Sequence, residues 1–471
     1  MNNEIEEKPM NAVAADLSAA PRASAFFVCV LAALAGLMFG LDIGVISGAT
    51  TFIQAEFGVP DRTIEWIVSA MMFGAAVGAA GAGWMSAALG RKRTLLLGAV
   101  LFVAGSLLCG AAWSPESLIG ARFALGLAIG LSAFTAPLYL AEVASEGSRG
   151  AMISLYQLMI TIGIFVAFLS DTAFSYSGSW RWMLGVIAIP GVLFLFGLFV
   201  LPDSPRWLLM RGRRNEALAV LRQLRGDEAV VAREAADIEE QLRTPQHGWS
   251  LFLENADFRR SVALGVMLQL VQQFTGMNVV MYYAPRIFQG MGYDTASQMW
   301  FTAAVGLTNV LATFIAIGLV DRWGRKPILY TGFAVMAVGL GVVGTMMYFG
   351  TTTRGEQAVA VSMLLVFIVG FAMSAGPLIW TLCSEVQPLK GRDFGVGCST
   401  FTNWIANMVV GATFLTLLNS IGAAATFWLY AALNALFIAF TWAFVPETRG
   451  VTLEQIERKL MQGVRLRDIG R

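Results

Sequence analysis

The stretch Phe26–Ile53, FFVCVLAALAGLMFGLDIGVISGATTFI, is a long apolar run that contains a single charge, Asp42. About 20 apolar residues in a helix suffice to cross a hydrocarbon core of about 30 Å. A charged Asp at the centre of such a helix costs about 2.5–3.5 kcal/mol on insertion scales, so a carboxylate that stays there is functional by default. The stretch therefore predicts a membrane helix with a working carboxylate, and carrying a proton is the task that suits it.

The whole chain has the composition of a membrane protein. It is 57% hydrophobic and 13% charged, whereas a soluble domain is about 25% charged. We therefore expect an all-α membrane protein with twelve transmembrane helices. The apolar runs lie near residues 26–53, 66–89, 94–113, 118–141, 152–174, 182–201, 260–288, 298–320, 328–349, 359–383, 394–418 and 424–445.

The polar and partly acidic first 22 residues, followed by an overlong apolar run, predict that no leader peptide is cleaved. Twelve spans then place both termini on one side, and the positive-inside rule makes that side the cytoplasm. The basic residues of the loops on that side are Arg91, Lys92, Arg93, Arg149, Arg322, Arg325, Lys326, Lys390 and Arg392, against Arg62, Arg181 and Arg354 opposite.

Several function classes are disfavoured. A net charge of +1 gives no sign of a nucleic-acid partner. The four cysteines lie inside predicted spans without metal-like spacing, and the only histidine, His247, lies in a soluble loop. No phosphate-binding loop ends in Gly-Lys-Ser/Thr, and Gly339–Gly344 matches a dinucleotide fingerprint only within a predicted span. We expect no metal, no cofactor and no enzyme activity.

Three motifs recur in order along the chain. Gly90-Arg91-Lys92 returns as Gly324-Arg325-Lys326, and Glu142 precedes Arg149 by seven residues as Glu385 precedes Arg392. The third pair, at the ends of spans 6 and 12, is Pro202-Asp203-Ser204-Pro205-Arg206 and Pro446-Glu447-Thr448-Arg449-Gly450. Three ordered repeats predict two similar six-helix halves, which is typical of transporters that rock about a midplane site.

Amphipathic segments separate and follow these halves. Apolar residues recur at helical spacing in 218–224 and 231–242, and again in 453–460 after a possible capping pair, Thr452 and Gln455. We predict short cytoplasmic helices there. The predicted domains are a tail (1–24), a six-helix bundle (25–202), a helical linker (203–258), a second bundle (259–448) and a tail (449–471).

These motifs, together with Asp42 and Gln272-Gln273-Phe274-Thr275-Gly276-Met277-Asn278, resemble the sugar porters of the major facilitator superfamily over essentially the whole chain. Within that family, Ser374–Trp380 and Gln387–Gly395 look most like bacterial galactose-proton symporters, with arabinose-proton symporters second. The resemblance implies the major facilitator fold, two pseudo-symmetric bundles and a place in the bacterial inner membrane.

Asp42 is expected to face away from its own glycine ridge. Gly36, Gly40, Gly44 and Gly48 form a smooth stripe for close helix packing. At about 100° per residue, Asp42 points roughly opposite that stripe. Arg122, the isolated charge of span 4, is its proposed partner. A static ion pair between spans 1 and 4 is the alternative, but the resemblance places a proton-coupling Asp at this position.

The expected sugar site lies on span 7. Neutral, hydroxyl-rich sugars need amides that both donate and accept. Gln269, Gln272, Gln273 and Gly276 share one helical stripe, and Gly276 can break the helix before Asn278. Polar residues that only join helices are the alternative. The resemblance adds sugar contacts at Gln157, Asn309, Trp380 and Asn403 and an outer gate at Tyr282 and Tyr283; for Trp380 and Trp404, packing against lipid or core stays open.

The resemblance also implies an inner salt-bridge network of Arg91, Glu142, Arg149, Arg325, Glu385 and Arg392 that holds the cytoplasmic side shut. Surface decoration is the alternative. Ala87 stands where the family often has an acidic or amide residue, while the second copy keeps Asp321, so we expect a weaker N-terminal latch.

The sequence thus predicts a sugar-proton symporter that acts as a monomer in the lipid bilayer, with D-galactose favoured, glucose accepted and the proton as coupling ion. The alternatives are an L-arabinose-proton symporter, an uncoupled facilitator and a membrane sugar sensor. Asp42 argues against the facilitator, and tails of about 25 residues leave a sensor little room for a signalling module.

Overall fold

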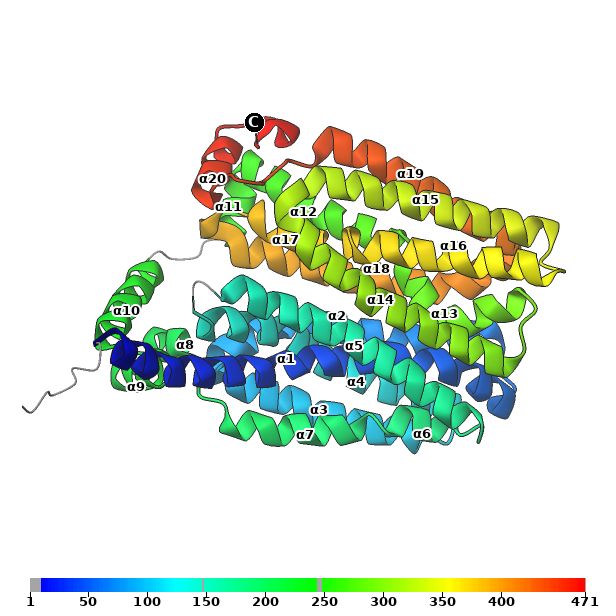
Figure 1. The fold of residues 1–471 in the computed structure, drawn as a ribbon, viewed down its shortest axis with the longest axis horizontal. Helices are drawn as coiled ribbons and strands as arrows, with labels where there is room; N and C mark the ends of the chain where they lie inside the picture. Colours follow the sequence, from blue (N-terminus) through cyan, green and yellow to red (C-terminus); the bar gives the residue numbers. More distant parts are fainter. Residues whose placement is uncertain (1–9, 146–147, 244–247, 471) are drawn as a thin grey trace, which may run out of the picture.

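The computed structural model describes residues 10–145, 148–243 and 248–470, without the side chains of 10–24, 317, 319–321, 389 and 453–454. His247, predicted to lie in a soluble loop, falls outside the described residues. Long, roughly parallel helices form two bundles that lie side by side (Figure 1).

The first bundle contains seven helices that make six crossings. The sixth is interrupted between α6 and α7. Residue Met10 begins α1, so this helix extends into the segment predicted as a tail. The bounds are α1 Met10–Phe57, α2 Asp61–Leu89, α3 Arg91–Gly110, α4 Pro115–Val143, α5 Arg149–Ser175, α6 Trp180–Gly185 and α7 Ala188–Val200.

The second bundle repeats this plan with two interrupted crossings, α12/α13 and α16/α17. We call the two bundles the first and second half. The bounds are α12 Ala256–Phe274, α13 Met277–Gly290, α14 Thr295–Trp323, α15 Arg325–Phe349, α16 Arg354–Ala372, α17 Ala375–Glu385, α18 Arg392–Ile421 and α19 Ala423–Phe444.

The predicted count of twelve transmembrane helices is confirmed, although length and hydropathy alone identify eleven of them within the described residues. The crossing not found in this way is α12/α13, which is divided into helices of 19 and 14 residues, and the longer of these, α12, carries three charged residues near its start, Asp257, Arg259 and Arg260. Gly276 divides it with a φ of 90°, a left-handed conformation that glycine adopts without steric cost. The predicted break at Gly276 is therefore confirmed.

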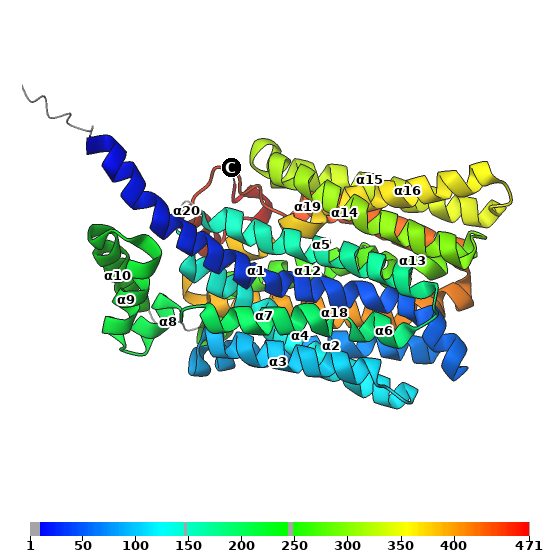
Figure 2. The ribbon, with the colours of Figure 1, turned by 60° about the horizontal axis from the view of Figure 1, so that its bottom comes forward.

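Short helices gather at one end of the bundles, which we call the linker end; the opposite end is the far end (Figures 1 and 2). The predicted amphipathic helices are present, and Thr452 caps α20 by accepting a hydrogen bond from Gln455 N. The bounds are α8 Pro205–Met210, α9 Arg214–Arg225, α10 Glu228–Leu242, α11 Gly248–Glu254 and α20 Leu453–Met461, with 3₁₀ turns η1 Leu389–Gly391 and η2 Leu466–Asp468.

The linker helices divide between the halves. Arg225 of α9 donates to the carbonyls of Val143 and Ala144 at the end of α4, at 3.0 and 3.2 Å. On α11, Trp249 and Phe252 pack against Phe394 of α18, with ring centroids 5.7 and 5.4 Å apart. Within the linker, α9 therefore packs on the first half and α11 packs on the second. The domain boundaries themselves stay a prediction.

Close packing of α1 on α5 is a tight constraint in the first half. A Cβ atom added to Gly40 would lie 2.0 Å from the carbonyl oxygen of Ile160, and one on Gly36 would lie 2.5 Å from that of Tyr156. Gly163 of α5 returns the contact against Leu37. The glycine stripe thus lets two backbones touch, as small residues do at membrane helix interfaces.

We predict that Gly40→Val destabilises the protein by at least about 1–3 kcal/mol, since the added side chain overlaps backbone that cannot move aside. Thermal unfolding in detergent measures the loss. Gly120→Val on α4 is the control, because nothing lies within 4 Å of a Cβ there. Equal unfolding temperatures for the two variants would contradict the packing account.

Candidate proton and substrate site

Asp42 and Arg122 form an ion pair in the centre of the first half. Nη1 of Arg122 on α4 donates to Oδ1 of Asp42 on α1, and both side chains are fully buried. The glycine stripe of α1 faces α5 instead, so Asp42 points to a different neighbour, as its helical position predicts. The structure thus brings together the two charges that the sequence singles out.

The pair is only partly satisfied by hydrogen bonds. Oδ2 of Asp42 and both Nε and Nη2 of Arg122 are buried without a hydrogen-bond partner among the described residues. A buried charge is stable only when it is well paired. The Tyr282 side chain lies near enough to interact electrostatically with both Asp42 and Arg122. Both members of the pair therefore keep polar atoms without a partner, and Tyr282 of α13 lies beside them.

An amide cluster joins α12, α17 and α18 in the second half. Nδ2 of Asn403 donates to Oε1 of Gln269 and of Gln272, at 2.6 and 3.0 Å. Nε2 of Gln272 donates to the carbonyls of Ala375 and Gly376, at 2.9 and 3.0 Å. Both N–H donors of Asn403 and both of Gln272 are used. Oδ1 of Asn403 and a second lone pair on Oε1 of Gln272 are left as acceptors.

The break at Gly276 brings Gln273 and Asn278 together. Nδ2 of Asn278 donates to Oε1 of Gln273 at 2.6 Å. In this arrangement Nε2 of Gln273 and Oδ1 of Asn278 stay available for a ligand that both accepts and donates. Three predicted sugar ligands of this crossing, Gln272, Gln273 and Asn278, therefore lie within hydrogen-bonded amide groups.

Tyr282 and Tyr283, the predicted gate, are buried on α13 and bound to α18. The Tyr282 hydroxyl is 3.0 Å from Nδ2 of Asn407, and the Tyr283 hydroxyl donates to the carbonyl of Gly411 at 2.8 Å. The Tyr283 ring stacks on Phe414 with centroids 5.4 Å apart. Both side chains thus fill the space between α13 and α18.

Other predicted contacts lie outside these hydrogen-bonded clusters. Gln157 of α5 is half-buried and Asn309 of α14 is buried. Trp380 of α17 is 38% exposed. The structure does not bring these three side chains to the amide cluster through any hydrogen bond among the described residues.

Two residues near the site, Asn407 and Asp171, escaped the sequence prediction, while Trp404, for which the sequence leaves packing against lipid or core open, is buried. Asn407 follows Asn403 by one helical turn, a spacing that could have revealed it. Trp404 packs on Phe39 with centroids 5.3 Å apart, and its Nε1 is buried without a hydrogen-bond partner among the described residues. Asp171 of α5 is buried and accepts from the Gly48 N–H of α1 at 2.9 Å. Trp404 joins the two halves beside the Asp42 segment.

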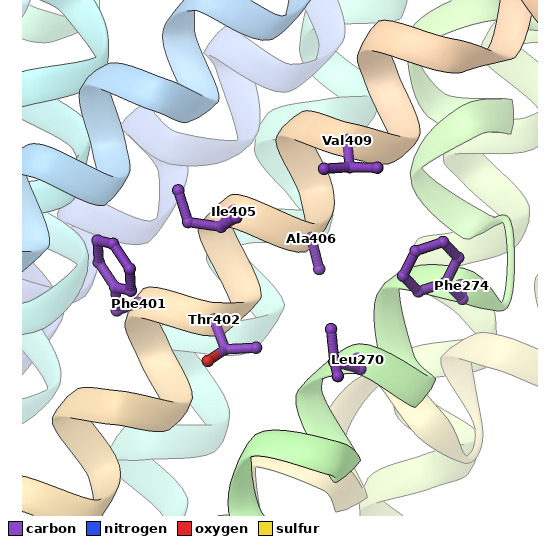
Figure 3. Close-up of a pocket in the computed structure, with 7 residues that line it drawn as sticks. All are labelled: Leu270, Phe274, Phe401, Thr402, Ile405, Ala406 and Val409. Carbon is purple, nitrogen blue, oxygen red and sulfur yellow. The ribbon is translucent and has the colours of Figure 1, made fainter.

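A cavity of about 230 Å³ lies between α12 and α18 (Figure 3). Its wall is almost entirely apolar, and the amides of Gln269, Gln272 and Asn403 do not line it. These amides lie on neighbouring positions of the same helices. The lining residues are Leu270, Phe274, Phe401, Thr402, Ile405, Ala406 and Val409.

The inner ion pairs lie within single halves. Arg91 binds both carboxylate oxygens of Glu142, at 2.8 and 2.7 Å, and Ser204 donates to the same carboxylate at 2.5 Å. Arg325 donates to Glu385 at 2.9 Å, and Thr448 does so at 2.5 Å. The two halves thus repeat one arrangement of arginine, glutamate and hydroxyl.

In this structure the pairs Arg91–Glu142 and Arg325–Glu385 each lie within one half, and a network that holds the cytoplasmic side shut in the outward-open state stays a prediction. The weaker N-terminal latch stays a prediction, although Arg91–Glu142 is a bidentate pair. The Asp321 side chain lies outside the described part of the chain. Arg149 is exposed, and Arg392 donates to the Gln387 carbonyl at 3.3 Å.

Among the described residues, no group of three or more His, Cys, Asp or Glu side chains could hold a metal ion. Cys29, Cys109, Cys383 and Cys398 are free thiols, the first three of them buried.

Residues 28–460 match the family described as Sugar (and other) transporter. This chain belongs to that family, within the major facilitator superfamily. It is 65% identical to the galactose-proton symporter of Escherichia coli (strain K12) over 95% of this chain and 97% of that protein. It is 57% identical to the arabinose-proton symporter of the same strain, over 94% and 95%.

Solved structures confirm the fold. The proton:xylose symporter XylE bound to 6-bromo-6-deoxy-D-glucose matches with a TM-score of 0.79 at 30% identity, over 93% of this chain and 99% of that one. The partially occluded inward open conformation of XylE from E. coli matches with a TM-score of 0.81 at 29% identity, over 91% and 100%. The chain is thus a transporter rather than an enzyme.

We predict that Glu142→Gln lowers the free energy of unfolding by about 1–3 kcal/mol, because it removes a buried acceptor of charged hydrogen bonds. Thermal unfolding in detergent reports the change. Glu228→Gln is the matched control, since its pair with Arg222 is 68% and 53% exposed and such pairs contribute little. A Glu142→Gln protein as stable as the control would show that the inner pair does not stabilise its half.

Proposed function

We propose that this chain is a proton-coupled monosaccharide symporter that imports D-galactose, and also glucose, across the bacterial cytoplasmic membrane by alternating access. The observation that carries the proposal is the fully buried Asp42–Arg122 pair. The greater identity to a galactose-proton than to an arabinose-proton symporter supports galactose as the preferred sugar. No cofactor is required, because the proton gradient supplies the energy.

Proton binding at Asp42 is the coupling step. Protonation removes the negative charge that holds Arg122, so the guanidinium, already short of hydrogen-bond partners, must find new acceptors. We infer that this release permits the sugar-loaded protein to reorient. Each proton that moves inward through the membrane potential contributes about 2.3 kcal/mol per 100 mV.

Sugar binding is assigned to the amides of the second half, with Gln272, Gln273, Asn278 and Asn403 as the principal ligands. Their free acceptors and donors suit hydroxyl groups, which do both. We place Gln157, Asn309 and Trp380 around the sugar as further contacts. Gly276-Met277-Asn278 aligns with Gly40-Leu41-Asp42, so the same position serves sugar in one half and the proton in the other.

We assign the linker end to the cytoplasm, with both termini there, because the positive-inside rule favours that side for its basic loops. The far end then faces outward. Tyr282 and Tyr283 are buried against α18, and we propose that they form an outer gate in its closed position. One buried apolar cluster extends through both halves, and we propose that a monomer transports.

A sugar counterflow panel in proteoliposomes tests this proposal. We expect unlabelled galactose to compete best for labelled galactose entry, glucose next and L-arabinose least. Arabinose as the strongest competitor would support an arabinose symporter instead. A protein that exchanges sugar but never concentrates it under a proton gradient would be an uncoupled facilitator.

Asp42→Asn should abolish galactose accumulation while counterflow continues, because the amide cannot carry the proton but still fills the same space. Uptake of labelled galactose with and without an imposed proton gradient measures both. Asp294→Asn, which changes an exposed carboxylate at the start of α14, is the control and should accumulate sugar normally. Accumulation by Asp42→Asn would show that the coupling site lies elsewhere.

Gln272→Ala and Asn403→Ala should each weaken galactose binding about two- to twelvefold, as expected from a lost hydrogen bond of about 0.5–1.5 kcal/mol. Isothermal titration calorimetry on purified protein measures the affinity. Gln357→Ala removes an amide bound to the Met291 carbonyl and should leave affinity unchanged. If all three variants bind alike, the amide cluster only joins helices.

A further inference from the structure

Two charged residues of α2 bind a single turn of α18 in the other half. Arg62 and Glu65 form an ion pair at 3.1 Å. The Glu65 carboxylate accepts from both the backbone N–H and the hydroxyl of Thr416, each at 2.7 Å. Arg62 donates to the carbonyl of Ala412 at 2.9 Å. In an α-helix the N–H of one residue bonds to the carbonyl four residues earlier. Arg62 and Glu65 therefore bind the carbonyl of Ala412 and the N–H of Thr416, which are related in this way.

The position of Glu65 makes this contact specific to one arrangement of the halves. Its side chain is only 1% exposed. A buried carboxylate requires hydrogen-bond donors, and those on Thr416 come from the second half. If α2 and α18 separate, Glu65 keeps only Arg62, which is itself 55% exposed. The contact therefore stabilises the state in which the far ends of α2 and α18 are together.

Asp61, one turn before Glu65, adds a second junction. Its carboxylate accepts from Arg286 of α13, Asn419 of α18 and Gln54 of α1, each at 2.8 Å. Arg286 lies one turn beyond Tyr282 and Tyr283 on the gate helix. Asp61 thus ties the gate helix to three other helices, two of them in the first half.

The linker end lacks an equivalent among the predicted inner pairs, since Arg91–Glu142 and Arg325–Glu385 each stay within one half. The ion pair Arg286–Asp61, by contrast, joins the halves at 2.8 Å. We propose that Asp61, Arg62 and Glu65 form an outer latch that holds the outer side closed and sets how often it opens. These three are positioning residues that act through α13 and α18 rather than by touching sugar.

This inference rests on the alternating access of the proposed function, but its test needs no sugar. Spin labels at Ser177→Cys in the first half and Ala296→Cys in the second, both exposed at the far end, report the opening of that end by electron–electron distance measurement in proteoliposomes. Cys398, the one cysteine that is not buried, is replaced by Ser in the background.

Glu65→Gln should raise the ratio of outer-open to outer-closed molecules about tenfold, a shift typical of coupling between conformational states. Asp61→Asn should raise it less, since the Asp61–Arg286 pair is 20% and 31% exposed. The matched control is Glu56→Gln, which removes the same charge at the same end from a pair with Arg181 that lies within the first half. It should leave the distances unchanged.

The double variant Asp61→Arg/Arg286→Asp should restore part of the outer-closed population that either single change loses. Such a recovery would show that the ion pair, and not general misfolding, sets the ratio of outer-open to outer-closed molecules. If Glu65→Gln fails to fold, Thr416→Val, which removes only the hydroxyl contact, provides the same test with a smaller expected shift. The latch would be overturned if the label distances stay unchanged both in Asp61→Asn and in Glu65→Gln, or in Thr416→Val where Glu65→Gln does not fold. This outcome does not depend on whether the wild-type protein accumulates galactose. If the wild-type protein fails to accumulate galactose while the label distances in the variants shift as expected, the proposed function alone is overturned.

Discussion

The buried ion pair between Asp42 and Arg122 is the interaction on which the rest of the structure depends. Taking two charges into an apolar interior is costly, and the cost is offset only when the geometry holds the charges together. Here α1 is fixed from behind by its glycine stripe on α5, while Gly126 and Gly130 of α4 pack against the backbone of α2. The pair is therefore held by two close helix contacts that leave it little freedom except through protonation.

The two halves use a shared plan for different chemistry. At the linker end, both halves carry an arginine, a glutamate and a hydroxyl residue in the same arrangement, with Ser204 in one and Thr448 in the other. At the centre they diverge, since the first half presents a carboxylate and the second presents amides beside the break at Gly276. The tyrosines of the proposed outer gate connect these centres, because Tyr282 lies near the ion pair and bonds to Asn407.

Local periodicity was sufficient to predict much of this arrangement. The direction of Asp42, the break at Gly276 and the amphipathic helices all follow from spacing within one segment. Contacts between distant segments do not. Glu65 and Thr416 are 351 residues apart, and nothing in the pattern around either residue indicates the other. The assignment of each inner pair to a single half similarly depends on how the bundles pack, and Asp171 was missed because its partner is a backbone N–H on another helix.

The central claim is that sugar entry and proton binding at Asp42 are one event. Galactose added to lightly buffered proteoliposomes without any imposed gradient tests it directly, with a pH electrode recording the external medium. The account predicts that the medium becomes alkaline as galactose enters and that Asp42→Asn gives no such change. Galactose entry through the wild-type protein without proton uptake, or proton uptake that persists in Asp42→Asn, would contradict it.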